Sequence, residues 1–190
     1  MRKIAIIDDD SSERLVIKGL ILDGGFSVVG EGENGREAVE LCRTKSPDLI
    51  IMDVKMPVKD GIDAAAEINR LFPVPVVLLT ASDDEETIRR AAEAGVMAYL
   101  LKPVRQEELL PAIEMAVSRF EEFKMLRQEN AELKDTLKSR KLIEKAKGLL
   151  MEREKLSESE AFTRIRKISM DKRKSMTEIA EVLILAFEKK

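Results

Sequence analysis

Short apolar runs alternate with stretches of helical periodicity over roughly the first hundred residues. The apolar runs lie at residues 4–7, 27–30, 49–52, 74–79 and 96–101. Each run is too short for a helix and is bounded by polar or turn-forming residues, so we predict five β-strands. Strands that are apolar throughout and separated by helices are typical of a parallel sheet covered on both faces. The pattern therefore predicts an α/β fold for this part of the chain.

Start signals support the helices predicted between these runs. Ser11 and Ser12 are expected to cap the first helix, because short hydroxyl side chains can accept from free backbone N–H groups. The second and third helices are predicted over about residues 35–43 and 61–72. The acidic residues from Asp83 to Glu86 are expected to open the fourth helix, since carboxylates are favoured at a helix N-terminus.

Beyond residue 105 the pattern is helical throughout, and Gly148 is the only glycine that follows. We predict one long helix over about residues 106–137 and then three shorter helices. The second and third of these begin at Ser157 and Ser175. A glutamate lies three residues after each serine, which is the spacing of a capping box.

A stripe with alternating three- and four-residue spacing runs along the second half of the long helix. It consists of Phe123, Leu126, Asn130, Leu133 and Leu137. This is the pattern of a coiled-coil seam with asparagine at an a position, where a parallel partner would present its own asparagine. The alternative is an amphipathic helix packed against its own chain, because the stripe is only about two heptads long. We favour a homodimer through this seam.

Charge is distributed unevenly between the two ends of the chain. Residues 1–118 carry 14 Lys/Arg and 22 Asp/Glu, whereas residues 138–190 carry 15 Lys/Arg and nine Asp/Glu. Such an asymmetry suggests two functions, and that of the basic C-terminal part would involve a polyanion. We predict three parts: a first domain over residues 1–117, a helical coiled-coil linker over 118–137 and an all-α three-helix output domain over 138–190.

Composition excludes several kinds of chemistry. The chain has no histidine, so it has neither a histidine-based catalytic triad nor a histidine-containing metal site. Its single cysteine, Cys42, cannot form an internal disulfide and is predicted to be a small core residue. We see no membrane span and no signal peptide, and we expect the protein in the cytoplasm, without membrane contact.

Polar residues follow four of the predicted strands where each strand ends. They are Asp8 and Asp9, Asp53, Thr80, and Lys102. The carboxyl ends of parallel strands meet at one edge of a sheet, so these side chains should converge there. Three carboxylates in one place repel one another unless a cation lies among them. Oxygen ligands without nitrogen or sulfur favour Mg²⁺, with Mn²⁺ as the alternative. Asp53 on the central strand is the best-placed nucleophile for a phosphoryl group.

These segments together resemble the receiver domain of bacterial two-component response regulators, which has a flavodoxin-like (βα)5 fold. The resemblance covers about 117 residues and is carried by Ile6-Ile7-Asp8-Asp9-Asp10, Met52-Asp53-Val54-Lys55-Met56-Pro57, Asp60-Gly61, Leu79-Thr80-Ala81 and Lys102-Pro103. It implies that Asp53 is the phosphoacceptor and that Asp8, Asp9, Asp53 and the backbone carbonyl of Lys55 serve Mg²⁺, with Asp8 acting through water. It also implies a cis peptide bond before Pro103.

The same resemblance implies a switch. Thr80 and Tyr99 form the switch pair, and Lys102 is the partner of the phosphoryl group, which adds about −1.5 to −2 units of charge. The resemblance implies a sensor histidine kinase as the partner, and we expect phosphorylation to promote the homodimer. The protein would not be an enzyme, apart from slow self-dephosphorylation at most.

The C-terminal part is basic, and the residues that we predict to touch nucleic acid are Lys145, Lys147, Gly148, Arg164, Arg166, Lys167, Lys172 and Arg173. Residues of about 125–185 resemble the ANTAR domain of transcription antitermination regulators. The resemblance is carried by Ala146-Lys147-Gly148, Leu150-Met151, Glu160-Ala161-Phe162, Ile165-Arg166, Ser169-Met170 and Ile179-Ala180. The order of receiver, helix and ANTAR domain is also similar to that of the ethanolamine-utilisation antitermination regulators.

The resemblance to the ANTAR family implies binding of RNA with paired stem-loops in mRNA leaders, which prevents transcription termination. Gly148 costs about 1 kcal/mol relative to alanine inside a helix, which a close helix–helix contact or a close approach of RNA backbone would explain. Phe162 is expected in the core, and Phe187 is a second candidate for it.

Two other output functions stay open: a DNA-binding regulator with a helix-turn-helix, and a module that docks a protein. Against DNA, no glycine marks a tight turn between the last two helices, and residues 171–175 are interpreted as a loose linker. Against a protein-docking module stands the basic excess of this part of the chain.

Overall fold

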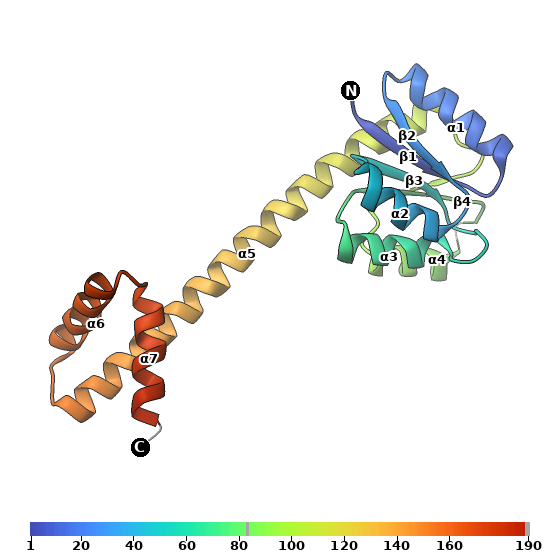
Figure 1. The fold of residues 1–190 in the computed structure, drawn as a ribbon. Coiled ribbons are helices and arrows are strands. Elements are labelled where there is room, and N and C mark those ends of the chain that lie inside the picture. The colour runs from blue at the N-terminus through green and yellow to red at the C-terminus, as the bar shows by residue number, and fades with distance from the viewer. Residues whose placement is uncertain (83, 189–190) are drawn as a thin grey trace. The chain divides into compact units, whose positions relative to one another are not determined.

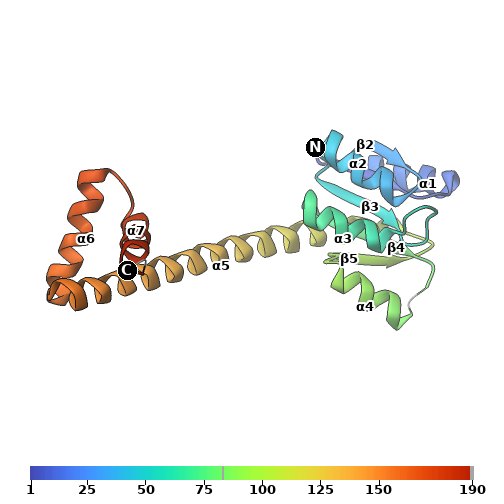
Figure 2. The same ribbon diagram turned by 60° about the horizontal axis from the view of Figure 1, so that its bottom comes forward.

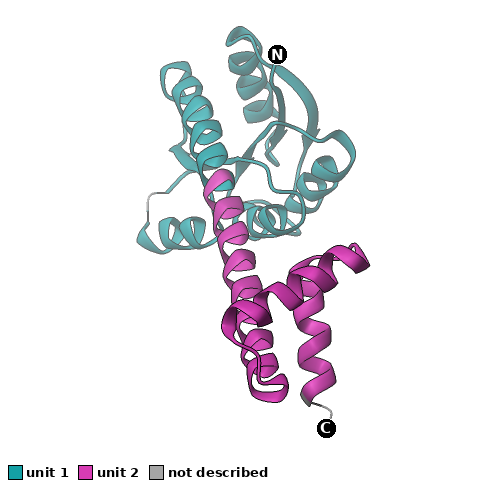
Figure 3. Ribbon diagram, turned by 90° about the vertical axis from the view of Figure 1, so that its left-hand side faces the viewer, with its two compact units in different colours: residues 1–124 teal, residues 125–190 magenta. Residues whose placement is uncertain are grey.

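The computed structural model describes residues 1–82 and 84–188, so Asp83, with which the fourth helix was expected to open, and Lys189 and Lys190, the last residues of the predicted output domain, lie outside the described residues. The chain forms two compact units, Met1–Lys124 and Met125–Lys190, shown in two colours in Figure 3. Each unit is described by itself.

The first unit is built on a five-stranded parallel sheet. Its strands are β1 (Lys3–Ile7), β2 (Ser27–Gly32), β3 (Leu49–Asp53), β4 (Val76–Thr80) and β5 (Ala98–Leu101). They lie in the order β2-β1-β3-β4-β5, so β3 is central and the order reverses beside β1 (Figure 1). The predicted α/β fold with a parallel five-stranded sheet is confirmed.

Helices cover both faces of this sheet, because alternate residues of each strand point to opposite sides. On one face, Ala5, Ile50 and Leu78 pack against α2 (Gly35–Lys45), α3 (Gly61–Leu71) and α4 (Glu85–Glu93). On the other face, the neighbouring strand residues pack against α1 (Ser11–Asp23) and the start of α5 (Gln106–Glu154). Figures 1 and 2 show the sheet between these two layers. Cys42 is buried in the first layer, as predicted.

Side-chain caps start the helices that follow the strands. The cap of α1 is Asp10, whose carboxylate accepts from the backbone N–H groups of Ser12 at 2.7 Å and Glu13 at 3.3 Å. Ser11 and Ser12 lie inside the first turn, so the prediction that they cap the helix was wrong. A carboxylate also satisfies the free N–H groups and, being charged, interacts favourably with the helix dipole. Asp60 and Asp84 play the same role for α3 and α4.

Helix α5 is continuous over 49 residues and takes part in both units. The sequence predicted one helix ending near residue 137 and another starting after it, and this break was wrong. Nothing in the segment ends a helix, since no proline or glycine lies between Pro111 and Gly148. No helix in the described part of the chain is long and apolar enough to cross a membrane.

The second unit packs the last turns of α5 against α6 (Glu158–Lys172) and α7 (Met176–Glu188). The buried side chains of its core are Ala146, Leu150, Ala161, Ile165, Ile179, Ala180 and Ile184. Both predicted capping boxes form: the side chain of Glu160 accepts from the backbone N–H of Ser157 at 2.8 Å, and that of Glu178 accepts from the backbone N–H of Ser175 at 2.9 Å.

The connection between α6 and α7 is a tight turn, not the loose linker predicted from the sequence. Arg173 adopts a left-handed conformation, with φ of 53°, and ends α6 without the help of a glycine. The backbone N–H of Lys174 then donates to the carbonyl of Ser169 at 3.1 Å, and the Ser169 hydroxyl donates to the carbonyl of Lys174 at 2.6 Å. A tight turn of this kind is compatible with a helix-turn-helix.

Candidate functional site

Three carboxylates from the carboxyl ends of β1 and β3 lie together. Asp8, Asp9 and Asp53 each present an oxygen, and these oxygens all lie within 4.8 Å of one another. Asp8 is fully buried and Asp53 nearly so, whereas Asp9 is exposed. The adjacent strands β1 and β3 place the carboxylates of Asp8 and Asp53 side by side, as predicted from the strand ends.

Lys102, just after β5, reaches across the sheet edge into this cluster. Its ammonium lies 2.8 Å from a carboxylate oxygen of Asp8 and 3.0 Å from one of Asp53. It also lies 2.5 Å from an oxygen of Glu13, in the first turn of α1. Glu13 was missed from the sequence, where its only signal is a position on the helix that starts directly after Asp8 and Asp9.

Burial governs the electrostatics of Asp53. Removal from water raises the pKa of the Asp53 carboxyl above its ordinary value, the ion pair with Lys102 opposes this rise, and the nearby Asp8 adds to it. Burial lowers the pKa of Lys102, but its contacts with Asp8, Glu13 and Asp53 outweigh burial, so the pKa of Lys102 is raised and the ammonium stays protonated. One ammonium contacts three carboxylates here, and Asp9 lies beside them, so negative charge remains in excess.

Thr80 is buried at the end of β4, close to the neighbouring loop. Its hydroxyl donates to the carbonyl of Ser82 at 2.8 Å and accepts from the N–H of Ser82 at 3.2 Å. Both bonds tie the hydroxyl to the loop before α4. A hydroxyl that turned toward a phosphoryl group would have to leave these partners, and the loop would be released.

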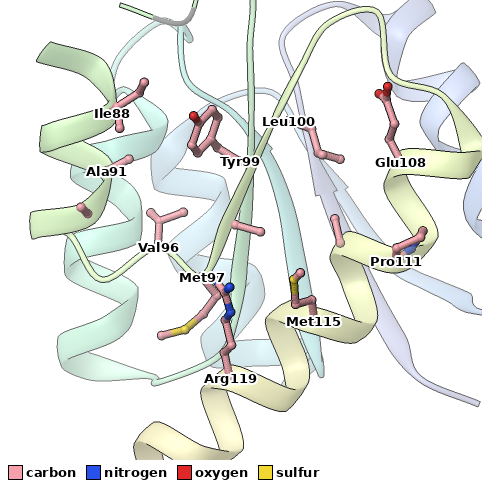
Figure 4. A pocket seen from close by; sticks show the side chains of 13 residues that line it. Ile88, Ala91, Val96, Met97, Tyr99, Leu100, Glu108, Pro111, Met115 and Arg119 are labelled. Carbon is pink, nitrogen blue, oxygen red and sulfur yellow. The ribbon is translucent and has the colours of Figure 1, made fainter. Parts of the chain in front are cut away.

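Tyr99, the only tyrosine of the chain, is 44 % exposed on β5. It borders a cavity of about 550 Å³ between α4, β5 and α5. Figure 4 shows its ring next to Ile88 and Ala91 of α4, on the side of the cavity away from Glu108 and Pro111 of α5. The ring therefore has space to move inward between the two helices.

The backbone after β3 turns back closely on Asp53. A Cβ on Gly61 would lie 2.0 Å from the carbonyl oxygen of Asp53, so only glycine fits this contact. The N–H of Gly61 donates to the carbonyl of Val54 at 2.9 Å, which holds the loop in place. The Lys55 side chain points to solvent, and only its backbone was predicted to act. The cis peptide bond expected before Pro103 is present.

The donor set fits a small hard cation. All candidate ligands are oxygens, and a divalent ion among Asp8, Asp9 and Asp53 would neutralise the excess of carboxylates. An acidic pocket of this kind is where receiver domains generally bind Mg²⁺.

We expect Mg²⁺ to raise the unfolding temperature of the first unit by about 5 °C when its concentration is ten times the Kd. Tyrosine fluorescence measures this unit alone, because the chain has one tyrosine, Tyr99, and no tryptophan. Asp9→Asn should remove most of the shift while leaving the metal-free protein equally stable, since Asp9 is exposed. Asp23→Asn, an exposed carboxylate at the end of α1, is the matched control. An unchanged shift in Asp9→Asn would exclude this carboxylate as a ligand.

In the second unit, Lys147 has partners within its own chain. Its ammonium lies 3.0 Å from an oxygen of Glu144 and 2.7 Å from one of Glu158, and the side chain is buried. It thus joins α5 to the start of α6, and its charge is balanced. This placement weighs against the prediction that Lys147 contacts RNA.

The other predicted RNA contacts lie on the surface. Lys145 is on α5, and Arg164, Arg166, Lys167, Lys172 and Arg173 are on α6 or just after it, and all six are exposed. Gly148 is part of α5, half-buried, and a Cβ there would meet nothing within 4 Å in the described structure. The close helix–helix contact considered for this glycine is therefore not formed by any described residue. Phe162 is 42 % exposed, so its expected place in the core was wrong, whereas Phe187 does pack against the core.

The predicted coiled-coil seam is on the surface of the single chain. Phe123 is 38 % exposed, Leu126 56 %, and Leu133 and Leu137 58 % each, and Asn130 is exposed as well. The alternative, an amphipathic helix packed against its own chain, is not what the structure has along this stripe.

Comparison with known families agrees with this arrangement. The model of the response regulator receiver domain matches residues 4–114, and that of the ANTAR domain matches residues 131–184. The chain therefore belongs to the response regulator receiver family, with a C-terminal ANTAR domain. Both domains are regulatory rather than catalytic.

Relatives support the whole arrangement. The chain is 45 % identical over 183 residues to the transcriptional regulatory protein PdtaR of Mycobacterium tuberculosis, an alignment that covers 96 % of this chain and 89 % of that protein. It is 37 % identical over 112 residues to the chemotaxis protein CheY of Bacillus subtilis, which covers 58 % of this chain and 93 % of CheY.

Among solved structures, the receiver domain of a modulated diguanylate cyclase from Desulfovibrio desulfuricans G20 superposes with a TM-score of 0.60 at 29 % identity, covering 64 % of this chain and 97 % of that one. The receiver domain of the response regulator NarL from M. tuberculosis gives 0.59 at 28 %, covering 62 % and 96 %.

Proposed function

We propose that the protein accepts a phosphoryl group on Asp53 from a sensor histidine kinase. The observation that carries this proposal is the meeting of Asp8, Asp9, Asp53 and Lys102 at one edge of the sheet. A carboxylate oxygen of Asp53 forms the bond to phosphorus, and the bond from phosphorus to the kinase histidine nitrogen breaks. Asp8, Asp9, Asp53 and the carbonyl of Lys55 would hold Mg²⁺, which supplies positive charge to the transferring group.

The residues around Asp53 then respond to the added charge. Lys102 exchanges its contact with the Asp53 carboxylate for one with a phosphoryl oxygen, which carries more charge. Thr80 leaves Ser82 and donates to another phosphoryl oxygen, and Tyr99 turns into the cavity between α4 and α5. The α4–β5–α5 surface changes shape, and a dimer forms with Phe123, Leu126, Asn130, Leu133 and Leu137 as its seam.

For the output we propose RNA binding by the ANTAR domain, in the cytoplasm, with prevention of transcription termination as the result. A dimer would present two such domains to two linked stem-loops. Support comes from the ANTAR match and from the exposed basic residues of α6. We keep the predicted boundaries, receiver to residue 117, linker to 137 and output domain beyond, as part of this proposal.

A DNA-binding helix-turn-helix is the second candidate, because α6 and α7 are joined by a tight turn. The helix in the recognition position would be α7, which contains no Lys or Arg and includes Glu178 and Glu181. Phosphate and base contacts need donors, so an acidic, apolar helix is poorly suited to a major groove. The RNA proposal is therefore favoured.

We expect phosphorylation to tighten RNA binding at least tenfold. RNAs with two hairpins and randomised loops are first selected on the full chain treated with acetyl phosphate and Mg²⁺. Fluorescence polarisation then compares the selected RNA with duplex DNA, at several salt concentrations, for the treated protein and for Asp53→Asn. Affinity for RNA should fall steeply with salt, since phosphate contacts release counterions.

Two outcomes would contradict the proposal. Tight binding of duplex DNA with none of RNA would replace it with the second candidate. Equal RNA affinity of Asp53→Asn and the phosphorylated protein would remove the switch and leave a constitutive RNA-binding protein.

A further inference from the structure

Gly148 lies in the interior of α5, and no contact among the described residues requires a glycine there. Glycine weakens a helix, and alanine would fit here because a Cβ would meet nothing within 4 Å among the described residues. The backbone of α5 at this position is therefore accessible to a molecule from outside that comes closer than a side chain would allow.

Phe162 on α6 is a second feature that the core does not explain. Its neighbour Ala161 and the residue one turn further, Ile165, are fully buried, whereas the Phe162 side chain is 42 % exposed. An aromatic ring presented to solvent offers a flat face on which another ring can stack.

An ion pair joins α5 and α6 close to these two features. Lys147, the residue before Gly148, binds Glu158 at 2.7 Å. Glu158 and Phe162 are four residues apart on α6 and so share one face of that helix. Met151, three residues after Gly148 and 39 % exposed, continues the α5 side of this surface. We call Gly148, Met151 and Phe162 the junction surface.

The charges beside the junction surface favour a polyanion. Arg166 follows Phe162 by one turn on the same face and is exposed. Within the described residues no ion pair is formed by Arg164, Arg166, Lys167, Lys172 or Arg173, in contrast to Lys147. The exposed side of α7 differs, since Val182 and Leu185 lie there without any basic neighbour on that helix. An RNA strand would therefore contact cations without an ion-pair partner along α6 and no cation on α7.

We propose that the junction surface binds one unpaired RNA base, which stacks on Phe162. Arg166 contacts the phosphate beside this base, and the RNA backbone passes over Gly148. The proposal rests on RNA binding by this domain and adds where the loop base is held. Unpaired loop bases are free to stack on aromatic side chains, and this contact tolerates any base because every base has a flat face.

The test uses the full chain treated with acetyl phosphate and the RNA selected on it. We expect Phe162→Leu to bind this RNA about tenfold more weakly, because leucine keeps the apolar bulk but lacks the aromatic face. Phe162→Tyr should bind almost like the original protein. With 2-aminopurine placed at each loop position in turn, one position should lose fluorescence on binding, and Phe162→Leu should abolish that loss.

Gly148 is tested by two substitutions that should each stabilise the helix and weaken RNA binding, to different degrees. Gly148→Gln should raise the unfolding temperature of the second unit, followed by circular dichroism, and still weaken RNA binding about tenfold, because its side chain occupies the path of the RNA. Gly148→Ala should raise the unfolding temperature with a smaller loss of affinity. Leu185→Gln, an exposed apolar position on α7, should leave RNA affinity unchanged.

The outcomes separate this inference from the proposed function. If no RNA can be selected on the phosphorylated chain, RNA binding fails and the inference fails with it. If RNA binds but Phe162→Leu binds equally well, with the same 2-aminopurine signal, only the inference is overturned. A loss of dimer mass in light scattering of Phe162→Leu would instead assign Phe162 to a contact between two copies of the chain and would also overturn it.

Discussion

Replacement of Asp53 by Asn is expected to abolish phosphoryl uptake from acetyl phosphate, with a loss of more than about 100-fold. The amide cannot form the acyl phosphate bond. Among the described residues, no other carboxylate combines the central strand position with contact to Lys102 as Asp53 does. The measurement is the phosphoprotein fraction in a phosphate-affinity gel or by intact mass. Asp23→Asn should incorporate phosphate normally, and sustained uptake by Asp53→Asn would move the acceptor to another side chain.

The same variant should also change the pH dependence of stability. Because the pKa of Asp53 is raised in the folded state, the folded protein binds more protons than the unfolded one between the ordinary and the raised value. The free energy of unfolding therefore falls as pH rises through this window. Without Mg²⁺, Asp53→Asn should lack this fall and be more stable than the original protein at neutral pH. A variant equally or less stable there would contradict the role given to burial.

Replacement of Gly61 by Ala is expected to destabilise the first unit by more than about 2 kcal/mol. The added Cβ would lie 2.0 Å from the carbonyl oxygen of Asp53, and a backbone atom cannot move aside as a flexible side chain can. The strand end that carries Asp53 must shift, so the Mg²⁺-dependent rise in unfolding temperature should shrink as well. Urea unfolding followed by Tyr99 fluorescence measures the first effect, and thermal unfolding with and without Mg²⁺, followed by the same fluorescence, measures the second.

Gly19→Ala is the matched control for this substitution. Gly19 lies in the interior of α1, and a Cβ there would meet nothing within 4 Å among the described residues. Alanine should therefore stabilise the same unit by about 0.5–1 kcal/mol. If Gly61→Ala matched Gly19→Ala, the close contact behind Asp53 would not constrain the site.

The receiver site was predictable because topology determines it. Short apolar runs separated by helices predict a parallel sheet, and the ends of parallel strands meet at one edge. Asp8, Asp53, Thr80 and Lys102 could be grouped on that ground before any coordinates. Glu13 could not, because its contact with Lys102 depends on where the first turn of α1 lies and on how far a long side chain reaches.

The output unit was less predictable, since its placements depend on packing rather than on periodicity. Phe162 was assigned to the core by its apolar character, but the buried face of α6 is formed by the smaller Ala161 and by Ile165. Lys147 was predicted to be a free cation, although two glutamates neutralise its charge. Glu144 lies one turn earlier on α5, and Glu158 lies on α6. Arg173 closes a tight turn in a conformation for which only glycine would have been anticipated.

The middle of α5 has a thermodynamic consequence of its own. Every residue from 121 to 138 is exposed, so this stretch gains almost nothing from burial and must rely on backbone hydrogen bonds and local side-chain pairs such as Gln128–Glu132. Most of the stability of helices in proteins comes from packing of an apolar face, which this stretch lacks within its own chain. A surface that covers the stripe, such as that of a second copy of the chain, would also suppress the helix–coil transition of residues 121–138. Association and local folding therefore form one coupled equilibrium.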